Sequence, residues 1–321
     1  MILITGATGF VGSELARQLT LNGDKIICLK RETSLIPHIL KQQVNIEWRN
    51  ADLLDYFSLK EAFAGVNYVY HCAAMVSFNP ADKKKMMKVN VEGTSNLVNI
   101  CQEMNIKKLV HVSSVAAVGD SKNGIPIAEN NHWEFNSSRS AYSISKYESE
   151  MEVFRAIAEG LNAVIVNPSI IIGKNAGTEG SGQLFATVRK GLKYYPSGSC
   201  GLVAVEDVAR SMIQLMNSNL SGKRYLINAE NYTYKDLFSQ IARGYGLKPP
   251  ATALKPWMLH LGYLGSKIIS GLIGNQTGLT KDTLNSAFKK QNYSNQKIRE
   301  ALNMEFKPIN QSISEICQSS E

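Results

Sequence analysis

The chain has few cysteines, and they are widely spaced. Five occur among its 321 residues, at positions 28, 72, 101, 200 and 317, and no two of them form a Cys-x-x-Cys pair. Disulfide frameworks use even numbers of cysteines, and zinc sites commonly use closely spaced pairs. The sequence therefore indicates neither a disulfide framework nor a metal site, and it favours reduced thiols in a cytoplasm.

The chain also lacks a clear secretion signal and a clear membrane span. Its N-terminus, "MILITG", leads directly into a predicted strand and a glycine turn, so we expect no signal peptide. The longest apolar stretch, residues 256–274, is interrupted by His260, Ser266, Lys267 and several glycines, which makes it too polar to span a bilayer. We expect a buried or substrate-lining helix there, with attachment to a membrane surface as the weaker alternative.

Positive charge exceeds negative charge, but no nucleic-acid-binding pattern accompanies it. Lys and Arg number 35 against 27 Asp and Glu, which gives a net charge of +8. The densest basic run, "KKKMMK" at 83–88, is typical of the solvated face of a helix. No zinc-finger, homeodomain or RNP pattern occurs, so a nucleic-acid partner is not expected.

Short apolar runs alternate with helix-length amphipathic segments through the first two-thirds of the chain. Seven runs have the length and composition of buried strands: "ILITG" at 2–6, "KIICLK" at 25–30, "NIEWRN" at 45–50, "VNYVYHCAA" at 66–74, "KKLVHVSS" at 107–114, "NAVIVNPS" at 162–169 and "KRYLINA" at 223–229. Buried parallel strands that are joined by helical crossovers predict an α/β fold with a doubly wound parallel sheet.

A glycine triad follows the first predicted strand. In "TGATGFVGSEL", Gly6, Gly9 and Gly12 open a helix. Glycines at this spacing permit a tight turn, let the backbone approach a pyrophosphate and let the helix pack on the strand. The free N–H groups and the positive end of the helix dipole then face the phosphates. The motif predicts a dinucleotide site on a Rossmann-type sheet.

The alternation of strands and helices loosens after residue 168. A glycine-rich loop, "GKNAGTEGSGQ" at 173–183, lacks the full phosphate-loop pattern, and the chain from 229 onward has a mostly helical pattern. We expect residues 1–167 and about 202–229 to form the dinucleotide-binding domain. Residues of about 168–201 together with 230–321 should form a smaller, mostly helical substrate-binding region.

The second predicted strand ends in two cations. An NAD enzyme usually has an acidic residue there for the ribose 2′-hydroxyl, whereas a 2′-phosphate needs cations. Lys30 and Arg31 occupy the place, and Asp24 precedes the strand and cannot reach. The planar fork of Arg31 suits a phosphate. NADP(H) is therefore favoured over NAD(H), the alternative being that both are ordinary surface cations.

Further stretches, in order along the chain, resemble the extended short-chain dehydrogenase/reductases of the NAD-dependent epimerase/dehydratase superfamily, in particular their dihydroflavonol-4-reductase-like branch. The stretches are "NADLLD" at 50–55, "HCAAMV" at 71–76, "KVNVEGTSNLV" at 88–98, "HVSSVAAVGD" at 111–120, "YSISK" at 142–146 and "NPSIIIG" at 167–173. The resemblance covers about residues 1–230. It implies catalytic roles for Ser114, Tyr142, Lys146 and Asn90. It implies cofactor contacts at Gly6, Thr8, Gly9, Phe10, Val11, Gly12, Lys30, Arg31, Asp52, Leu53, Ala73, Ala74, Ser113, Tyr142, Lys146, Pro168 and Ser169.

Tyr142 and Lys146 are four residues apart, which places them on one face of a helix. Alone, this spacing is typical of a surface helix, but the matching stretches identify the two residues as a catalytic pair. A tyrosine pKa of about 10 needs about 4 kcal/mol to reach neutral pH, and an ammonium about 4 Å away supplies that order of energy. The resemblance implies that Lys146 also holds the nicotinamide ribose, that Ser114 binds the substrate oxygen and that Asn90 orders backbone or water behind the lysine.

The sequence leaves three functions open. The favoured one is an NADP(H)-dependent reductase of a small, apolar or aromatic carbonyl substrate. A nucleotide-sugar 4-epimerase or dehydratase on the same fold is the alternative, and a non-enzymatic dinucleotide sensor is disfavoured because sensors of this family typically lack the tyrosine or the lysine. A nucleotide sugar needs cations for its diphosphate. Only Lys174, Arg189 and Lys193 stand near the expected places.

Large apolar side chains in the same region suit an apolar substrate better. The expected pocket loops lie near 75–78, Trp133 and 182–185, and the apolar residues considered are Phe185, Tyr194, Tyr195 and Trp257.

The helix of Tyr142 also has a second apolar arc, formed by Ile144, Tyr147, Met151, Phe154 and Ala158. This arc packs on a neighbouring helix or on a second copy of the chain, which leaves a homodimer open.

Overall fold

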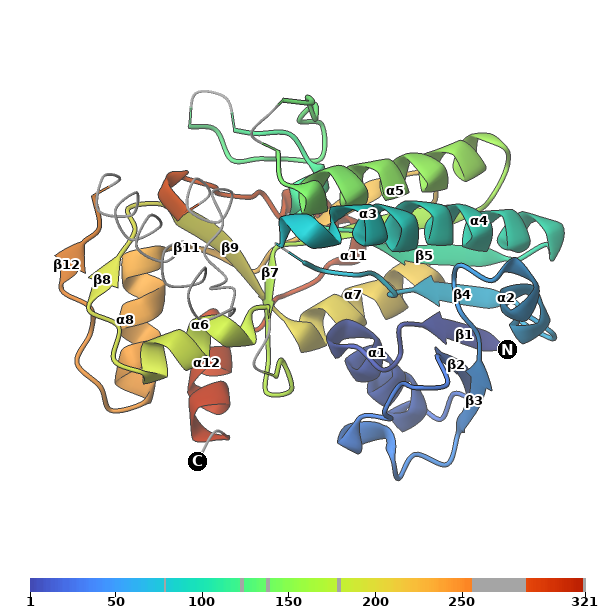
Figure 1. Ribbon diagram of the computed structural model, residues 1–321, viewed down its shortest axis with the longest axis horizontal. Coiled ribbons are helices and arrows are strands. Elements are labelled where there is room, and N and C mark those ends of the chain that lie inside the picture. The colour runs from blue at the N-terminus through green and yellow to red at the C-terminus, as the bar shows by residue number, and fades with distance from the viewer. Residues whose placement is uncertain (78, 122–123, 137–138, 178–179, 256–286, 320–321) are drawn as a thin grey trace.

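Seven parallel strands form the central sheet of the computed structural model, which describes residues 1–77, 79–121, 124–136, 139–177, 180–255 and 287–319. Their order is β10-β6-β5-β4-β1-β2-β3 (Figure 1). The strands are β1 (Ile2–Thr5), β2 (Ile26–Lys30), β3 (Ile46–Asn50), β4 (Tyr68–His71), β5 (Lys108–Val112), β6 (Ala163–Pro168) and β10 (Arg224–Ile227). Each lies inside one of the seven apolar runs, so the predicted doubly wound α/β fold is confirmed.

Helices cover both faces of this sheet (Figure 1). On one face lie α1 (Phe10–Leu21), α7 (Val205–Asn217) and α11 (Gln296–Leu302). On the other face lie α2 (Tyr56–Ala62), α4 (Gly93–Glu103) and α5 (Ala141–Ala158), with α3 (Lys83–Met87) and the π-helix η3 (Lys88–Glu92) leading into α4. Within the described ranges, three short 3₁₀ helices connect elements, namely η1 (His38–Leu40), η2 (Pro80–Asp82) and η4 (Val115–Ala117).

Burial on both faces explains the near-continuous apolar strand sequences. Leu109 of β5 belongs to the core under α4 and α5, whereas its neighbour Val110 belongs to the core under α1 and α7. Lys108 and His111 are the buried polar residues of this strand, and the Lys108 ammonium donates to the carbonyls of Leu215 and Ser218, both at 2.6 Å. These carbonyls end α7, where a cation is favoured by the helix dipole.

A smaller lobe lies beside the sheet, at the left of Figure 1. It contains a three-stranded sheet of order β11-β9-β7 and a two-stranded sheet of β12 and β8. Its strands are β7 (Ile170–Ile172), β8 (Tyr194–Tyr195), β9 (Ser199–Ala204), β11 (Glu230–Thr233) and β12 (Thr252–Ala253). Its helices are α6 (Gly182–Arg189), α8 (Tyr234–Gly244) and α12 (Ile309–Gln318), which share one core with the three-stranded sheet.

The two lobes meet within a short stretch of chain. Strand β9 pairs with β7 and β11 in the small sheet, and α7, which begins at the next residue, packs in the core of the large sheet. The proposed domain boundary near residue 202 therefore falls inside β9, and the division into two domains stays a prediction. The expected helix at 256–274, with Trp257, lies outside the described residues. Among the described residues, no helix is long and apolar enough to cross a membrane.

Candidate active site

The glycine turn has the close contacts that a dinucleotide motif requires. Gly6 has a φ of 68°, and a Cβ there would lie 2.6 Å from the Ala73 nitrogen. A Cβ on Gly12 would lie 2.2 Å from the Gly6 carbonyl oxygen. Gly9 precedes α1 without a side-chain cap, so the first N–H groups of the helix face the space above the turn. Both contacts are with backbone atoms, so only glycine lets the turn and the start of α1 pack this closely.

The remaining residues expected at the cofactor follow the C-terminal ends of several strands. In parallel sheets these ends meet at one edge, and ligands bind where the strand order reverses, here between β1 and β4. Lys30 ends β2 half-buried, and Arg31 follows it exposed. The others at this edge or in the turns next to it are Thr8, Phe10, Val11, Asp52, Leu53, Ala73, Ala74, Ser113, Pro168 and Ser169.

Leu53 is fixed and Asp52 is exposed in the turn after β3. The carbonyl of Leu53 accepts from the Asn96 amide at 2.9 Å, and its side chain lies where a Cβ on Gly93 would approach it to 3.0 Å. Asp52 accepts from the Leu54 nitrogen at 2.9 Å through Oδ1, which orients the carboxylate. Such a turn is suited to an adenine contact, and that contact stays a prediction.

The catalytic candidates come from the end of β5 and the start of α5. The Ser140 side chain accepts from the Ser143 nitrogen and caps α5, so Tyr142 and Lys146 occupy its first two turns. The Tyr142 hydroxyl is hydrogen-bonded to Ser114, which lies two residues after the end of β5. The Lys146 ammonium donates to the Val112 carbonyl at 2.8 Å and is buried. The structure thus brings the three predicted residues together.

The electrostatics differ from the expectation at Tyr142. Burial raises the pKa of Tyr142, and its hydrogen bond with Ser114 opposes that shift. Lys146 is turned to the Val112 carbonyl, and it does not produce the lowered tyrosine pKa that the sequence argument assumed. Burial lowers the pKa of Lys146 to about 8, and the nearby Glu150 carboxylate opposes this. Tyr142 is therefore protonated at neutral pH, and Lys146 is mostly charged.

Asn90 ties the loop after β4 to the catalytic helix. It lies in the π-helix η3, and its side-chain amide donates to the Met75 carbonyl at 2.9 Å and to the Ser145 hydroxyl at 3.0 Å. Its side-chain oxygen accepts from the Met75 nitrogen at 2.7 Å. Asn90 thus orders backbone as expected, although its part in catalysis stays a prediction.

Sequence reasoning missed a buried network below Lys146. Glu150 is fully buried, is paired with Arg224 at 3.1 Å and is hydrogen-bonded to the Asn167 amide. The same amide donates to the Ser114 carbonyl at 2.9 Å. Burial raises the pKa of Glu150, and these partners oppose the shift. The signal was an acidic residue one helical turn after Lys146, but its partner on β10 was not recognisable before folding.

Of the residues expected in the substrate pocket, Phe185 serves packing instead, whereas the place of the half-buried Trp133 in that pocket stays a prediction. Trp133 stacks on Tyr147 with ring centroids 4.0 Å apart, on a flank of α5 that does not carry Tyr142. Its indole nitrogen donates to the Ser143 hydroxyl at 3.3 Å. Phe185 is buried in the core of the small lobe. Phe78, another candidate, lies outside the described residues.

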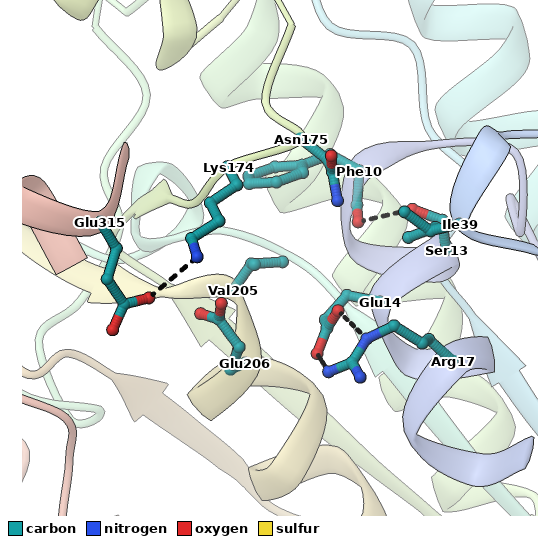
Figure 2. A pocket seen from close by; sticks show the side chains of 10 residues that line it. All are labelled: Phe10, Ser13, Glu14, Arg17, Ile39, Lys174, Asn175, Val205, Glu206 and Glu315. Atoms are coloured by element: carbon teal, nitrogen blue, oxygen red, sulfur yellow. Dashed lines mark hydrogen bonds and ion pairs between the residues drawn. The ribbon is translucent and has the colours of Figure 1, made fainter. Parts of the chain in front are cut away.

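Three cations were considered as ligands for the diphosphate of a nucleotide sugar, and the structure gives each of them a different environment. Lys174 points into a cavity of about 230 Å³ between α1, α7 and α12, where it lies 3.7 Å from Glu315 (Figure 2). No residue of α5 lines this cavity. The Arg189 guanidinium lies 5.5 Å from the Tyr245 ring centroid, and Lys193 is exposed. None of them forms a described cluster beside Tyr142.

The sequence pattern of the NAD dependent epimerase/dehydratase family matches this chain over residues 2–228. The chain belongs to this family. The resemblance to extended short-chain dehydrogenase/reductases is thereby confirmed, and the protein is an oxidoreductase of that type. Its fold with the seven-stranded sheet agrees with that of similar solved structures.

Individual relatives include reductases along most of the chain. Sterol demethylase protein B of Methylococcus capsulatus is 30% identical over 80% of this chain and 78% of its own. A putative dihydroflavonol 4-reductase of Synechocystis is 27% identical over 97% of this chain and 92% of its own. The crystal structure of gox2253 superposes with a TM-score of 0.86, at 32% identity over 99% of this chain and 97% of that chain. UDP-glucose 4-epimerase of Thermotoga maritima, at 20% identity and a TM-score of 0.80 over 99% of this chain and 98% of its own, shares the fold.

Proposed function

We propose that this family member is an NADP(H)-dependent reductase of a ketone or aldehyde on a small, apolar or aromatic substrate. The observation that carries the proposal is the Tyr142 hydroxyl, protonated and hydrogen-bonded to Ser114, above a buried Lys146. Relatives named dihydroflavonol 4-reductase, anthocyanidin reductase and cinnamoyl-CoA reductase support a carbonyl reductase of this kind.

The residues at the sheet edge fit a dinucleotide, because the glycines let the turn pack tightly and α1 begins after Gly9 without a side-chain cap on its first N–H groups. When bound, the cofactor supplies the hydride that is exchanged with the substrate carbon. The first N–H groups of α1 would hold the pyrophosphate, and Lys30 with Arg31 would hold the 2′-phosphate. Lys146 would hold the nicotinamide ribose, with Pro168 and Ser169 beside the nicotinamide.

In the reduction direction, Tyr142 acts as the general acid. Its raised pKa keeps the proton that the carbonyl oxygen of the substrate must receive. Ser114 accepts a hydrogen bond from the Ala116 nitrogen at 3.1 Å, which orients its hydroxyl so that its own proton can point to the substrate oxygen. Lys146 would act on turnover through the nicotinamide ribose that it holds, because its ammonium is turned to the Val112 carbonyl and does not lower the Tyr142 pKa.

Substrate panels distinguish this function from the epimerase alternative. We expect consumption of NADPH on flavonoid, steroid and cinnamoyl carbonyl compounds. We expect no binding of UDP- or dTDP-sugars tighter than about millimolar, because Lys174 is already paired with Glu315 and Arg189 lies over the Tyr245 ring. Titration calorimetry is the measurement for the sugars. A micromolar dissociation constant for any nucleotide sugar would favour the epimerase instead.

We also place the enzyme in the cytoplasm. All five cysteines are free, and four of them are buried in the core. Burial raises the pKa of Cys28 and Cys72 to about 12, so these thiols are protonated at neutral pH. A reducing compartment suits thiols of this kind.

A further inference from the structure

His71, the last residue of β4, joins two threonines across the core. Its side chain is completely buried. Its Nδ1 lies 2.7 Å from the Thr5 hydroxyl on β1, and its Nε2 lies 3.0 Å from the Thr94 hydroxyl on α4. Both threonines are themselves buried. Neither the reductase chemistry nor the cofactor contacts above assign His71 a role.

The directions of these hydrogen bonds follow from counting protons. The Thr94 hydroxyl donates its one proton to the Asn90 carbonyl at 2.6 Å, so it can only accept from His71. Nε2 of His71 therefore carries a proton. Nδ1 of the neutral ring is then an acceptor, and it receives the proton of the Thr5 hydroxyl. Thr5 in turn accepts from the Ala73 nitrogen at 3.2 Å.

The chain of hydrogen bonds ends at two functional positions. At one end, Ala73 lies against the glycine turn, since a Cβ on Gly6 would come within 2.6 Å of its nitrogen. At the other end, Asn90 holds Met75 and, through the Ser145 hydroxyl, the catalytic helix α5. One side chain thus connects the expected floor of the cofactor site with the helix that carries Tyr142.

We infer that His71 is a positioning residue which, as the neutral Nε2–H tautomer, fixes Ala73 against the glycine turn and fixes the Asn90 backbone beside the catalytic helix. The link to cofactor binding rests on the proposed function, whereas the tautomer does not. A histidine protonated on both nitrogens would break the chain, because Thr5 would then lose its acceptor.

The surroundings keep the ring neutral. Lys146 on α5 faces it, and the ring of His111 on β5 lies 5.0 Å away between centroids. Burial, and secondly the Lys146 charge, lower the pKa of His71 to about 3. Burial, His71 and Lys146 also lower the pKa of His111 well below its usual value. Neither ring gains a charge at neutral pH, so the tautomer is constant there.

Nitrogen-15 NMR on histidine-labelled protein tests the tautomer without any substrate or cofactor. The chain has only five histidines, so the signals can be assigned by comparison with a His71→Gln variant. We expect an Nε2–H tautomer for His71 whose shifts stay constant from about pH 5.5 to 8, outside the range in which an ordinary histidine titrates. An Nδ1–H tautomer, or titration near pH 6.5, overturns the inference.

Threonine variants test the two ends separately. Thr5→Val has nearly the same shape but no hydroxyl, so we expect NADPH to bind about fivefold more weakly in a fluorescence titration, the worth of one hydrogen bond. Thr5→Ser keeps the hydroxyl and should restore binding. Thr94→Val should lower kcat on a carbonyl substrate about fivefold with cofactor affinity retained, for the same reason.

Thr20→Val on α1 is the matched control, because its buried hydroxyl donates to the Ala16 carbonyl at 3.0 Å and contacts no site residue. Equal cofactor affinity of Thr5→Val and Thr20→Val, with both variants folded, contradicts the inference. The same holds if Thr5→Ser fails to restore binding. A protein that binds NADPH normally and reduces no carbonyl would count against the reductase, while the NMR and Thr5 results still decide the role of His71.

Discussion

At the scale of single residues, the end of β2 carries two cations and no carboxylate. Lys30 is half-buried and Arg31 is exposed, whereas Asp24 lies at the other end of the strand. A 2′-phosphate at this place would gain charge-assisted hydrogen bonds from both side chains, and a 2′-hydroxyl would gain little. We therefore expect Lys30 and Arg31 to decide the preference for NADP(H) over NAD(H).

Replacing Lys30 and Arg31 together by Ala should weaken NADPH binding by about 2–4 kcal/mol and leave NADH binding nearly unchanged, because only the phosphate contacts are lost. Fluorescence titration with each cofactor is the measurement. Lys25→Ala, an exposed lysine just before β2, is the control. Equal losses for both cofactors would refute the assignment of NADP(H).

Glu150 should control the charge of Lys146. Burial lowers the pKa of Lys146 to about 8, and the Glu150 carboxylate opposes this shift. In Glu150→Gln the pKa of Lys146 falls, so Lys146 loses its proton at a lower pH than in the wild type. The neutral lysine binds the cofactor less tightly. Cofactor affinity measured against pH should show this shift to lower pH.

Glu152→Gln is the control for this experiment, because Glu152 lies on the same helix and pairs with Arg155 instead. An unshifted profile in Glu150→Gln, matching that of Glu152→Gln, would show that Glu150 does not act on Lys146. The sequence indicates Lys146 and Tyr142 through the family stretches around them, since their spacing alone is typical of a surface helix. It does not reveal Glu150 as a partner of Arg224, because 74 residues separate that pair and only the folded sheet brings them together.

At the scale of elements, α5 has more apolar surface than one buried face needs. The chain itself covers part of the second arc, since Trp133 stacks on Tyr147 and Phe154 packs against the core under α4. Met151 is half-buried and Ala158 is exposed. The homodimer through this arc stays a prediction, with less free surface than the sequence suggested.

That homodimer predicts a definite response to charge. Wild-type protein should sediment as a dimer, and Met151→Glu as a monomer, because an unpaired carboxylate in a contact between copies is costly. Glu152→Gln, on the same helix, should leave the sedimentation unchanged. A wild-type protein that is monomeric at high concentration would contradict the homodimer.

The same scale separates the strands that the sequence predicts from those that it does not. Six of the seven central strands are mostly buried and stand out as apolar runs, whereas the edge strand β3, with the sequence IEWRN, has no fully buried residue. Strands β8 and β12 have two residues each, and β7 has three. Segments so short carry no periodic pattern, and their pairing depends on distant partners such as Tyr194 with Thr252.

At the scale of the whole molecule, two buried neutral histidines make stability depend on pH. His71 and His111 have lowered pKa values in the folded chain, whereas in the unfolded chain they titrate near about 6.5. Below that pH the two histidines bind protons in the unfolded state but stay neutral in the folded state. The free energy of unfolding should therefore fall by about 1.4 kcal/mol per pH unit for each histidine as the pH drops from about 6.5 to 5.

His111→Leu should remove about half of this slope. Within the described part of the chain neither ring nitrogen of His111 has a hydrogen-bond partner, so a leucine leaves no group unsatisfied. Urea unfolding at several pH values between about 5 and 7 measures the slope, in the window set by the unfolded pKa. The exposed His132, replaced by Leu, is the control. Equal slopes for His111→Leu and wild type would contradict the assignment of a buried neutral ring.

The central claim is that the Tyr142 hydroxyl transfers the proton during carbonyl reduction, and Tyr142→Phe tests it most directly. With a carbonyl substrate from the panel, turnover should fall by about 10²–10⁴-fold, the usual worth of a general acid. NADPH affinity and thermal stability should stay at the wild-type level, whereas Lys146→Ala should lose both turnover and cofactor affinity. A Tyr142→Phe enzyme that keeps more than about a tenth of the wild-type rate would mean that a different group is the acid.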